Sequence, residues 1–271
     1  RMIGQRMPRN HRPRRNFSAI ARCALAAGAW LSARPVARAT DADTLFREGV
    51  AAESRLDSRG ALALFLQADR ARPDDPATLQ KIARQYSDLV VDLPTVEEKK
   101  RSAQSALAYA ERAAALAPRD PVNLLSLAIC HGTLAVYSDV GTKVKYSRLV
   151  KDEAERALAL DPGYSWAHHV LSRWNCEVTS LGAPSRLFVS LFQGGLPDAS
   201  VAVGVAHLER AVALEPGELE HVLELGFAYL AAGRKADARA QFEKGLAMPS
   251  REKHDEPAKE RAREALARLG R

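Results

Sequence analysis

The sequence predicts an all-α fold in which pairs of antiparallel helices stack into an α-solenoid. Alanine and leucine are abundant and aromatic residues make up only 6% of the chain, a composition that favours helices. Runs of β-branched residues bounded by turn signals are nearly absent, so no sheet is expected. Beyond residue 40, an alanine-rich phrase ending in proline recurs at 68–73, 113–118, 157–162 and 211–216. Each proline marks a helix end, which indicates an internal repeat.

The repeat fits the 34-residue template of the tetratricopeptide repeat (TPR). The unit from residue 42 has Gly49, Ala61 and Phe65 at template positions, and the unit from residue 219 has Gly226 and Phe242. Small residues let the two helices of a unit approach closely, and units stack because one pair cannot bury its apolar face alone. We therefore expect a repeat domain over 40–271, consisting of about five helical pairs (42–75, 76–120, 121–164, 165–218 and 219–252) and a charged capping helix (255–271).

The three central repeats exceed the template by 11, 10 and 20 residues, and each excess falls between the two helices of its repeat. We expect these insertions to form loops or short helices at one end of the stack. The longest insertion contains the apolar side chains Leu187, Phe188, Leu191 and Phe192, followed by Gly194-Gly195. Such a run is too apolar for a free surface loop, so it should fold back onto the stack or contact a partner.

The middle of the chain resembles the regulator of microtubule dynamics family of TPR-like proteins. The resemblance rests on 82–88 (IARQYSD), on 128–132 (AICHG) leading to 141–143 (GTK), and on 171–178 (LSRWNCEV) followed by the long insertion. It covers about residues 76–250, and the Arg-Trp-x-x-Glu-Val segment is its most specific part. The chain has Ser172 where the family often has glycine. The resemblance implies a TPR-like fold and, in animals, microtubule association.

Residues 1–39 have the layout of an export signal. An Arg-rich stretch precedes a modestly apolar segment (17–31), and 37–39 (Ala-Arg-Ala) is a small-x-small cleavage pattern before residue 40. The segment is too short to span a membrane. The pair at 14–15 (Arg-Arg) also resembles a twin-arginine motif. We expect a bacterial protein exported to the periplasm, and a mitochondrial transit peptide, which is also Arg-rich, is the alternative.

The net charge of +7 belongs to this leader. Residues 1–39 hold nine arginines and no acidic residue, which leaves 31 basic and 33 acidic residues in the rest of the chain. A nearly neutral body with both signs mixed along its helices lacks the basic surface that nucleic acids require. No nucleic-acid partner is expected.

In a TPR stack the first helix of each pair lines a concave groove. The template places there Arg84, Ser87, Asp88, Thr133, Trp166, His169, Arg173 and Glu177. An arginine four residues before an acidic residue occurs twice in the same register, as Arg84 with Asp88 and as Arg173 with Glu177. Such pairs lie on one helix face. Two interpretations remain open: the pairs order the groove, or they clamp a bound peptide.

The sequence holds no motif that predicts catalysis. Gly-x-Ser-x-Gly, His-Glu-x-x-His, Cys-x-x-Cys and a phosphate-binding glycine loop are all absent, so no catalytic residue and no cofactor are predicted. His168, His169 and Cys176 lack the further ligands of a tetrahedral site, so no metal is predicted. Cys130 and Cys176 are interpreted as buried thiols, and a bridge between them requires that their helices touch.

The sequence therefore predicts a non-catalytic scaffold that binds an unidentified peptide or protein segment in its concave groove. A second hypothesis is an assembly component that uses 187–192 to dimerise or to touch a membrane. A third is the microtubule-associated role that the family resemblance implies, with tubulin as a partner only in a eukaryotic or cytosolic setting.

Overall fold

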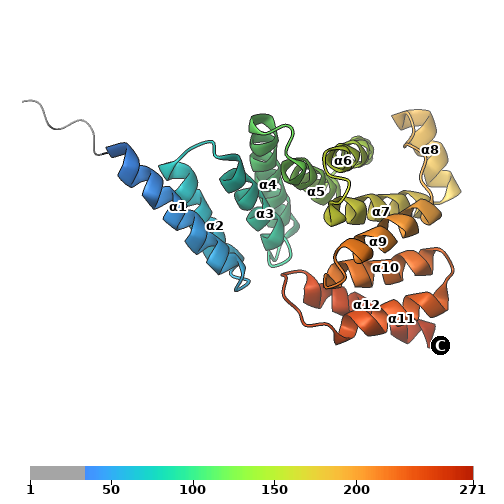
Figure 1. Ribbon diagram of the computed structural model, residues 1–271. Helices are drawn as coiled ribbons and strands as arrows, with labels where there is room; N and C mark the ends of the chain where they lie inside the picture. Colours follow the sequence, from blue (N-terminus) through green and yellow to red (C-terminus); the bar gives the residue numbers. More distant parts are fainter. Residues whose placement is uncertain (1–33, 271) are drawn as a thin grey trace, which may run out of the picture.

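The computed structural model describes residues 34–270, which form twelve helices and no strand (Figure 1). The predicted all-α, TPR-type fold is confirmed. In chain order the helices are α1 (Arg34–Glu53), α2 (Ser58–Ala71), α3 (Pro76–Leu89), α4 (Val96–Leu116), α5 (Pro121–Ala135), α6 (Val140–Leu160), α7 (Ser165–Ser180), α8 (Ala183–Gln193), α9 (Val201–Leu214), α10 (Leu219–Ala231), α11 (Lys235–Ala247) and α12 (Asp255–Leu269).

The helices pack as consecutive pairs, and each pair stacks on the next. The pairs are α1–α2, α3–α4, α5–α6, α7–α9 and α10–α11, and α12 covers α10 and α11. Alanines without measurable exposure fill the crossings in every pair, such as Ala61, Ala106, Ala157, Ala211 and Ala238. Because alanine adds no bulk beyond Cβ, the backbones can come close together, and this is the role that the template predicts for small residues.

Two glycines show how tight these crossings are. A Cβ at Gly49 would lie 2.6 Å from the ring of Phe65, and a Cβ at Gly226 would lie 2.5 Å from the ring of Phe242. Both distances are far below van der Waals contact, so any larger residue would have to displace a fully buried ring. The first and the last repeat therefore use the same pairing of a glycine on the first helix with a phenylalanine on the second.

Two of the three insertions differ from the expectation of loops or short helices. In the second and third repeats most of the extra chain lengthens the second helix, because α4 and α6 have 21 residues each whereas α2 has 14. Helix α4 begins early because Thr95 and Glu98 form a reciprocal capping box, and α6 begins where Asp139 accepts a hydrogen bond from the backbone of Thr142. Only the fourth repeat holds a separate short helix, α8.

The stack curves so that its C-terminal end approaches its N-terminal half (Figure 1). The segment 248–254 between α11 and α12 carries side chains that reach α3, as the ion pairs described below show. Helix α3 packs on α2, α4 and α5, whereas α12 packs on α10 and α11. The two ends are therefore joined by side chains and not by an extended helix–helix interface.

The predicted export signal lies largely outside the described residues. Helix α1 begins at Arg34, so the predicted cleavage pattern at 37–39 falls within its first turns. Among the helices of the described part, none is both long enough and apolar enough to cross a membrane.

Candidate functional site: the concave face

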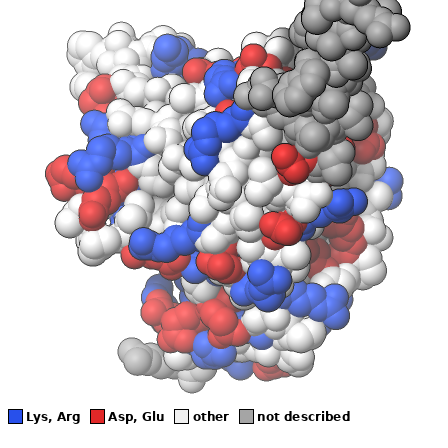
Figure 2. Space-filling model, turned by 90° about the vertical axis from the view of Figure 1, so that its left-hand side faces the viewer, with Lys and Arg blue, Asp and Glu red and all other residues white. Residues whose placement is uncertain are grey.

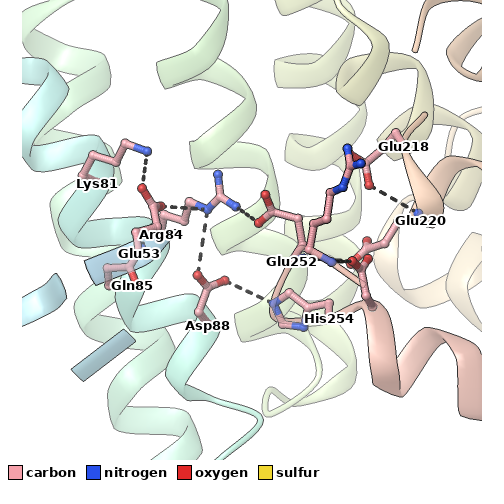
Figure 3. Close-up of polar contacts among 11 residues, drawn as sticks. Glu53, Lys81, Arg84, Gln85, Asp88, Glu218, Glu220, Glu252 and His254 are labelled. Carbon is pink, nitrogen blue, oxygen red and sulfur yellow. Dashed lines mark hydrogen bonds and ion pairs between the residues drawn. The ribbon is translucent and has the colours of Figure 1, made fainter. Parts of the chain in front are cut away.

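The concave face is the candidate site, and its most connected residue is Arg84 on α3 (Figure 3). Its guanidinium lies 3.3 Å from Glu53 on α1, 3.8 Å from Asp88 one turn further along α3, and 2.6 Å from Glu252. Burial lowers the pKa of Arg84, but the three carboxylates outweigh burial and raise it. The predicted pairing of Arg84 with Asp88 is present, and two further carboxylates join it.

Glu53 anchors this cluster to the first repeat. Its carboxylate accepts from Lys81 Nζ at 2.6 Å and from Gln85 Nε2 at 2.9 Å, in addition to its contact with Arg84. The Glu53 side chain is only 13% exposed. Three donors from neighbouring positions of α3 therefore hold one largely buried carboxylate of α1.

Three successive residues of the α11–α12 linker pair with oppositely charged residues of the second repeat. Besides Arg84 with Glu252, His254 Nε2 lies 3.1 Å from Asp88 Oδ1, and Lys253 Nζ lies 2.7 Å from Asp92 Oδ2. We call these three contacts the linker bridge. Most of its side chains are partly exposed, so each pair contributes roughly 0.2–1 kcal/mol and is weakened by salt.

Acidic residues of α10 and its N-terminal boundary lie beside the linker bridge. Burial raises the pKa of Glu220 to about 7; the positive charge of His254 lowers it, whereas the neighbouring carboxylates Asp255 and Glu218 raise it. Burial also raises the pKa of Glu218. Near neutral pH, Glu220 is therefore close to the pH at which its carboxyl group titrates.

The second predicted pair, Arg173 with Glu177, is also formed. Arg173 Nη2 lies 2.9 Å from Glu177, and its Nε lies 3.8 Å from Glu224 on α10. Glu224 in turn lies 3.4 Å from Arg261 on α12, whose guanidinium covers the ring of Phe227 at 4.5 Å. This network, the Arg173 network, connects α7, α10 and α12, which are neighbouring elements of the stack.

The aromatic residues predicted for the groove lie deeper than the charged ones. His169 is 4% exposed, and its Nδ1 is 3.0 Å from Nδ1 of the fully buried His221, with Trp166 packed against both rings. Burial lowers the pKa of His169 well below its usual value, with a further contribution from His221, and burial lowers the pKa of His221 to about 4. Burial therefore favours the neutral form of both histidines, which lie beneath the charged residues.

Ser87 and Thr133 make contacts with their own surroundings and not with one another. The Ser87 hydroxyl lies 3.7 Å from the thiol of Cys130, and the Thr133 hydroxyl donates to the carbonyl of Ile129 on its own helix. Cys130 is buried, and both it and Cys176 are free thiols. The structure thus brings Arg84 and Asp88 into one cluster and Arg173 and Glu177 into another.

Sequence reasoning placed two residues in each cluster and missed the others. Glu252, Lys253 and His254 lie between helices, outside any template position, and their contacts depend on the curvature of the whole stack. Glu53 and Glu224 do lie in helices, at 13% and 17% exposure. The sequence did contain a signal for these two residues. Each is an acidic residue in a predicted helix, one repeat before or after an arginine that faces inward.

The insertion helix α8 lies at the edge of the stack, where it contacts α6. Val189 is buried and Arg148 of α6 binds the carbonyl groups of Gln193 and Gly195, which ties the end of α8 to α6. The other apolar side chains point outward, with exposed fractions of 60% for Leu187, 47% for Phe188, 66% for Leu191 and 68% for Phe192. The expected apolar contact is therefore formed only in part, and an apolar surface remains.

The surface seen from the N-terminal side carries both charges. In Figure 2 lysine and arginine are interspersed with aspartate and glutamate, and no broad area of the described part of this face has a single sign. This distribution agrees with the nearly neutral composition of the body.

The described helices form a stack of TPR-like helical pairs whose inward-facing helices carry charged side chains, which defines the protein as a TPR-like α-solenoid. Residues 39–270 match the family model described as regulator of microtubule dynamics protein 1-3. The chain belongs to this family, which confirms the resemblance found in the sequence.

Curated relatives agree with this assignment. The chain is 28% identical over 159 residues to regulator of microtubule dynamics protein 3 of Xenopus laevis, covering 59% of this chain and 34% of that protein. It is 24% identical over 195 residues to regulator of microtubule dynamics protein 1 of Bos taurus, covering 71% and 62%. The chain thus spans about a third of the first relative and less than two thirds of the second.

A solved structure supports the fold. A thermophilic TPR protein of Thermus thermophilus superposes with a TM-score of 0.62 at 22% identity, covering 83% of this chain and 99% of that one. At this identity the likeness establishes the TPR-like architecture alone.

Proposed function

We propose that this protein is a non-catalytic interaction scaffold that binds a peptide or protein segment on its concave face. The observation that carries the proposal is the row of ionisable side chains along that face, which includes Arg84 and Arg173 at 41% and 47% exposure. Exposed guanidinium groups at fixed positions can form paired hydrogen bonds with carboxylates of a bound segment. The TPR-like fold supports a protein or peptide as the partner.

Capture experiments with a double variant test this proposal. Immobilised wild type should retain partners from a lysate of the source organism, and Arg84→Ala with Arg173→Ala should lose them. The matched control is Arg239→Ala with Arg268→Ala, which removes two exposed arginines from ion pairs within α11 and α12. If the partners captured by wild type all remain on the groove variant, the concave face is not the binding surface.

Export forms a separate part of the proposal. The Arg-rich leader and its small-x-small pattern support a protein that acts in the periplasm after cleavage, with mitochondrial import as the alternative. N-terminal sequencing of the mature protein should give a start at Thr40. A mature protein that retains the leader would contradict both forms of targeting.

The exposed face of α8 supports a second candidate function, self-association or contact with a membrane. Four large apolar side chains on one short helix form a surface of the kind that proteins cover with a partner. The double variant Leu191→Ser and Phe192→Ser should lower the native mass or abolish binding to vesicles. A variant with the mass and vesicle binding of wild type would exclude this function for α8.

The names of the relatives suggest a third candidate, an effect on microtubules in a eukaryotic or cytosolic setting. Co-sedimentation of the purified protein with polymerised tubulin tests this directly. Recovery of the protein in the supernatant at all tubulin concentrations would remove tubulin as a partner.

A further inference from the structure

The linker bridge places residues 252–254 against the face that the proposed function assigns to a bound segment. We propose that the charged face formed by Arg84, Asp88 and Asp92 recognises a segment with one acidic residue followed by two basic residues, and that residues 252–254 (Glu-Lys-His) occupy it in the free protein. This inference rests on the proposed function, because it names the partner chemistry of the same concave face.

The charges of the face and of the linker are complementary residue by residue. Arg84 and Asp88 are one turn apart on α3, and Asp92 follows in the turn after that helix. Each of them meets an opposite charge from three consecutive linker residues, at 2.6, 3.1 and 2.7 Å. Figure 3 shows Glu252 and His254 reaching across to Arg84 and Asp88 from the far end of the stack.

This order of charges discriminates between partners. A uniformly acidic segment would bring carboxylates against Asp88 and Asp92, and a uniformly basic one would bring cations against Arg84. Like charges placed opposite one another oppose binding. The face therefore selects mixed sequences in which the acidic residue comes first.

The linker is held in a conformation that presents these side chains. The Asp255 carboxylate is buried and accepts hydrogen bonds from the backbone of Arg251 at 2.6 Å and of Glu252 at 2.8 Å. This fold of the backbone belongs to the start of α12 and does not involve α3. The presenting loop can therefore persist when the bridge opens.

The linker bridge can be replaced by the same contacts with a partner segment. Residues 250–254 carry no apolar side chain, and the flanking helices α11 and α12 pack on each other and on α10 without an extended contact to α3. Arg84, Glu252 and His254 are each more than 40% exposed. A partner segment with the same charges can thus replace the linker without opening the core of the stack.

A competition experiment tests the inference. The probe is a fluorescent peptide with the sequence of residues 249–256 (PSREKHDE), titrated into the full chain at low ionic strength. The receptor variant Glu252→Gln, Lys253→Gln and His254→Gln removes the internal competitor, and we expect it to bind the peptide about tenfold more tightly than wild type. A tenfold gain corresponds to a face that is about 90% occupied by the linker in the free protein.

Two controls keep the test specific. The triple variant Lys235→Gln, Glu264→Gln and Arg268→Gln changes the same kinds of charge on α11 and α12 away from the bridge, and it should bind as wild type does. In the second control, the Glu-Lys-His of the probe, which corresponds to residues 252–254, is reordered to Lys-His-Glu. This peptide should bind at least about fivefold more weakly than the probe, because its charges then face like charges of the receptor. Equal binding by wild type and the linker-neutralised receptor, or of the two peptides, would overturn the inference.

A charge reversal guards against loss of binding through misfolding. In the linker-neutralised background Arg84→Glu should abolish binding of the probe, and a peptide with lysine at the position of Glu252 should restore it. If neither peptide binds this receptor while its unfolding curve matches that of wild type, the assignment of Arg84 to the acidic residue of the segment is wrong.

Failure of the proposed function looks different from failure of this inference. If lysate partners depend on Arg84 and Arg173 but neutralising the linker brings no gain for the peptide, only the inference fails. If the peptide result holds and no partner is captured, only the broader function fails.

Discussion

Arg84 on α3 and Arg173 on α7 have the same place in their repeats, and each has an acidic residue four positions later, yet they make different contacts. Arg173 pairs with carboxylates of adjacent elements and stabilises a packed interface above two buried histidines. Arg84 pairs with Glu252, 168 positions further along the chain, across a part of the stack without helix–helix packing. The same local pattern therefore joins neighbouring helices in one repeat and distant parts of the chain in another.

The largest expected effect concerns the histidines under the Arg173 network. Burial lowers the pKa of His221 from 6.5 to about 4, so the folded protein binds this proton less readily than the unfolded chain does. The neutral ring contributes stability above pH 6.5, and that stability is lost as pH falls toward 4. The shift corresponds to roughly 3 kcal/mol. Urea unfolding across this pH range should show the loss.

The variant His221→Gln separates this titration from that of other groups. It lowers stability at neutral pH, and the difference between variant and wild type should shrink as pH falls from 6.5 to about 4. A difference that is constant across this range would show that His221 does not titrate with folding.

The next prediction compares the loss of stability when Glu224, which pairs with Arg173, or Glu252, which pairs with Arg84, is neutralised. Glu224 is 17% exposed and lies between Arg173 and Arg261, so Glu224→Gln removes a largely buried carboxylate that two guanidinium groups share and should cost about 1–3 kcal/mol. Glu252 is 43% exposed, and Glu252→Gln should cost less than about 1 kcal/mol. Chemical denaturation measures both.

Glu260→Gln provides the exposed control for this comparison, since it removes a pair with Arg263 on the same helix. Its unfolding free energy should stay near that of wild type. Equal losses for Glu224→Gln and Glu252→Gln would mean that the two arginine sites are structurally equivalent, and the comparison would fail.

The bridge should affect shape more than stability. Neutralising Glu252, Lys253 and His254 frees the C-terminal end from α3, so small-angle scattering should show a larger radius of gyration. High salt should do the same to wild type, because at about 1 M the screening length falls to about 3 Å. Arg173→Ala should leave the radius unchanged. A compact variant would show that the curvature is held by packing alone.

The sequence predicts the interior of the repeats better than the relation between their ends. Gly49 and Phe65 could be placed in advance, because a backbone crossing this tight admits only a small residue opposite a ring. The two Arg–acid pairs follow from helical spacing. The partner of Arg84 could not be predicted, because a small rotation at each of several junctions decides whether Glu252 reaches it.

The lengths of α4 and α6 could be predicted from the sequence less well than the interior of the repeats, but better than the partner of Arg84. The capping box of Thr95 with Glu98 is a local signal that α4 begins at Val96, so its extra turns could have been predicted. The 34-residue template contains no such cap, and its use alone led to the expectation of a loop or a short helix where α4 is lengthened.

The smallest expected effect is a pH response of the bridge opposite in sign to that of the buried histidines. The hydrogen bond with Asp88 raises the pKa of His254; burial lowers it, while the charges of Asp88 and Glu220 raise it and that of Arg84 lowers it. A base with a raised folded pKa contributes fully below its unfolded value of 6.5, and its contribution disappears as pH rises through the raised value. The bridge should therefore loosen on the alkaline side, whereas the α7–α10 interface weakens on the acidic side.

NMR titration of the His254 ring and scattering between about pH 6 and pH 9 measure this response. The radius of gyration should rise slightly with pH in wild type. It should rise less in His254→Gln, in which Glu220, whose pKa burial raises to about 7, still titrates beside the bridge. The two regions then respond to protonation in opposite ways. Protonation of His254 strengthens the linker bridge, whereas protonation of His221 destabilises the α7–α10 interface. A radius that rises as pH falls through the same range would reverse the sign, and would place the bridge under the same control as the buried interface.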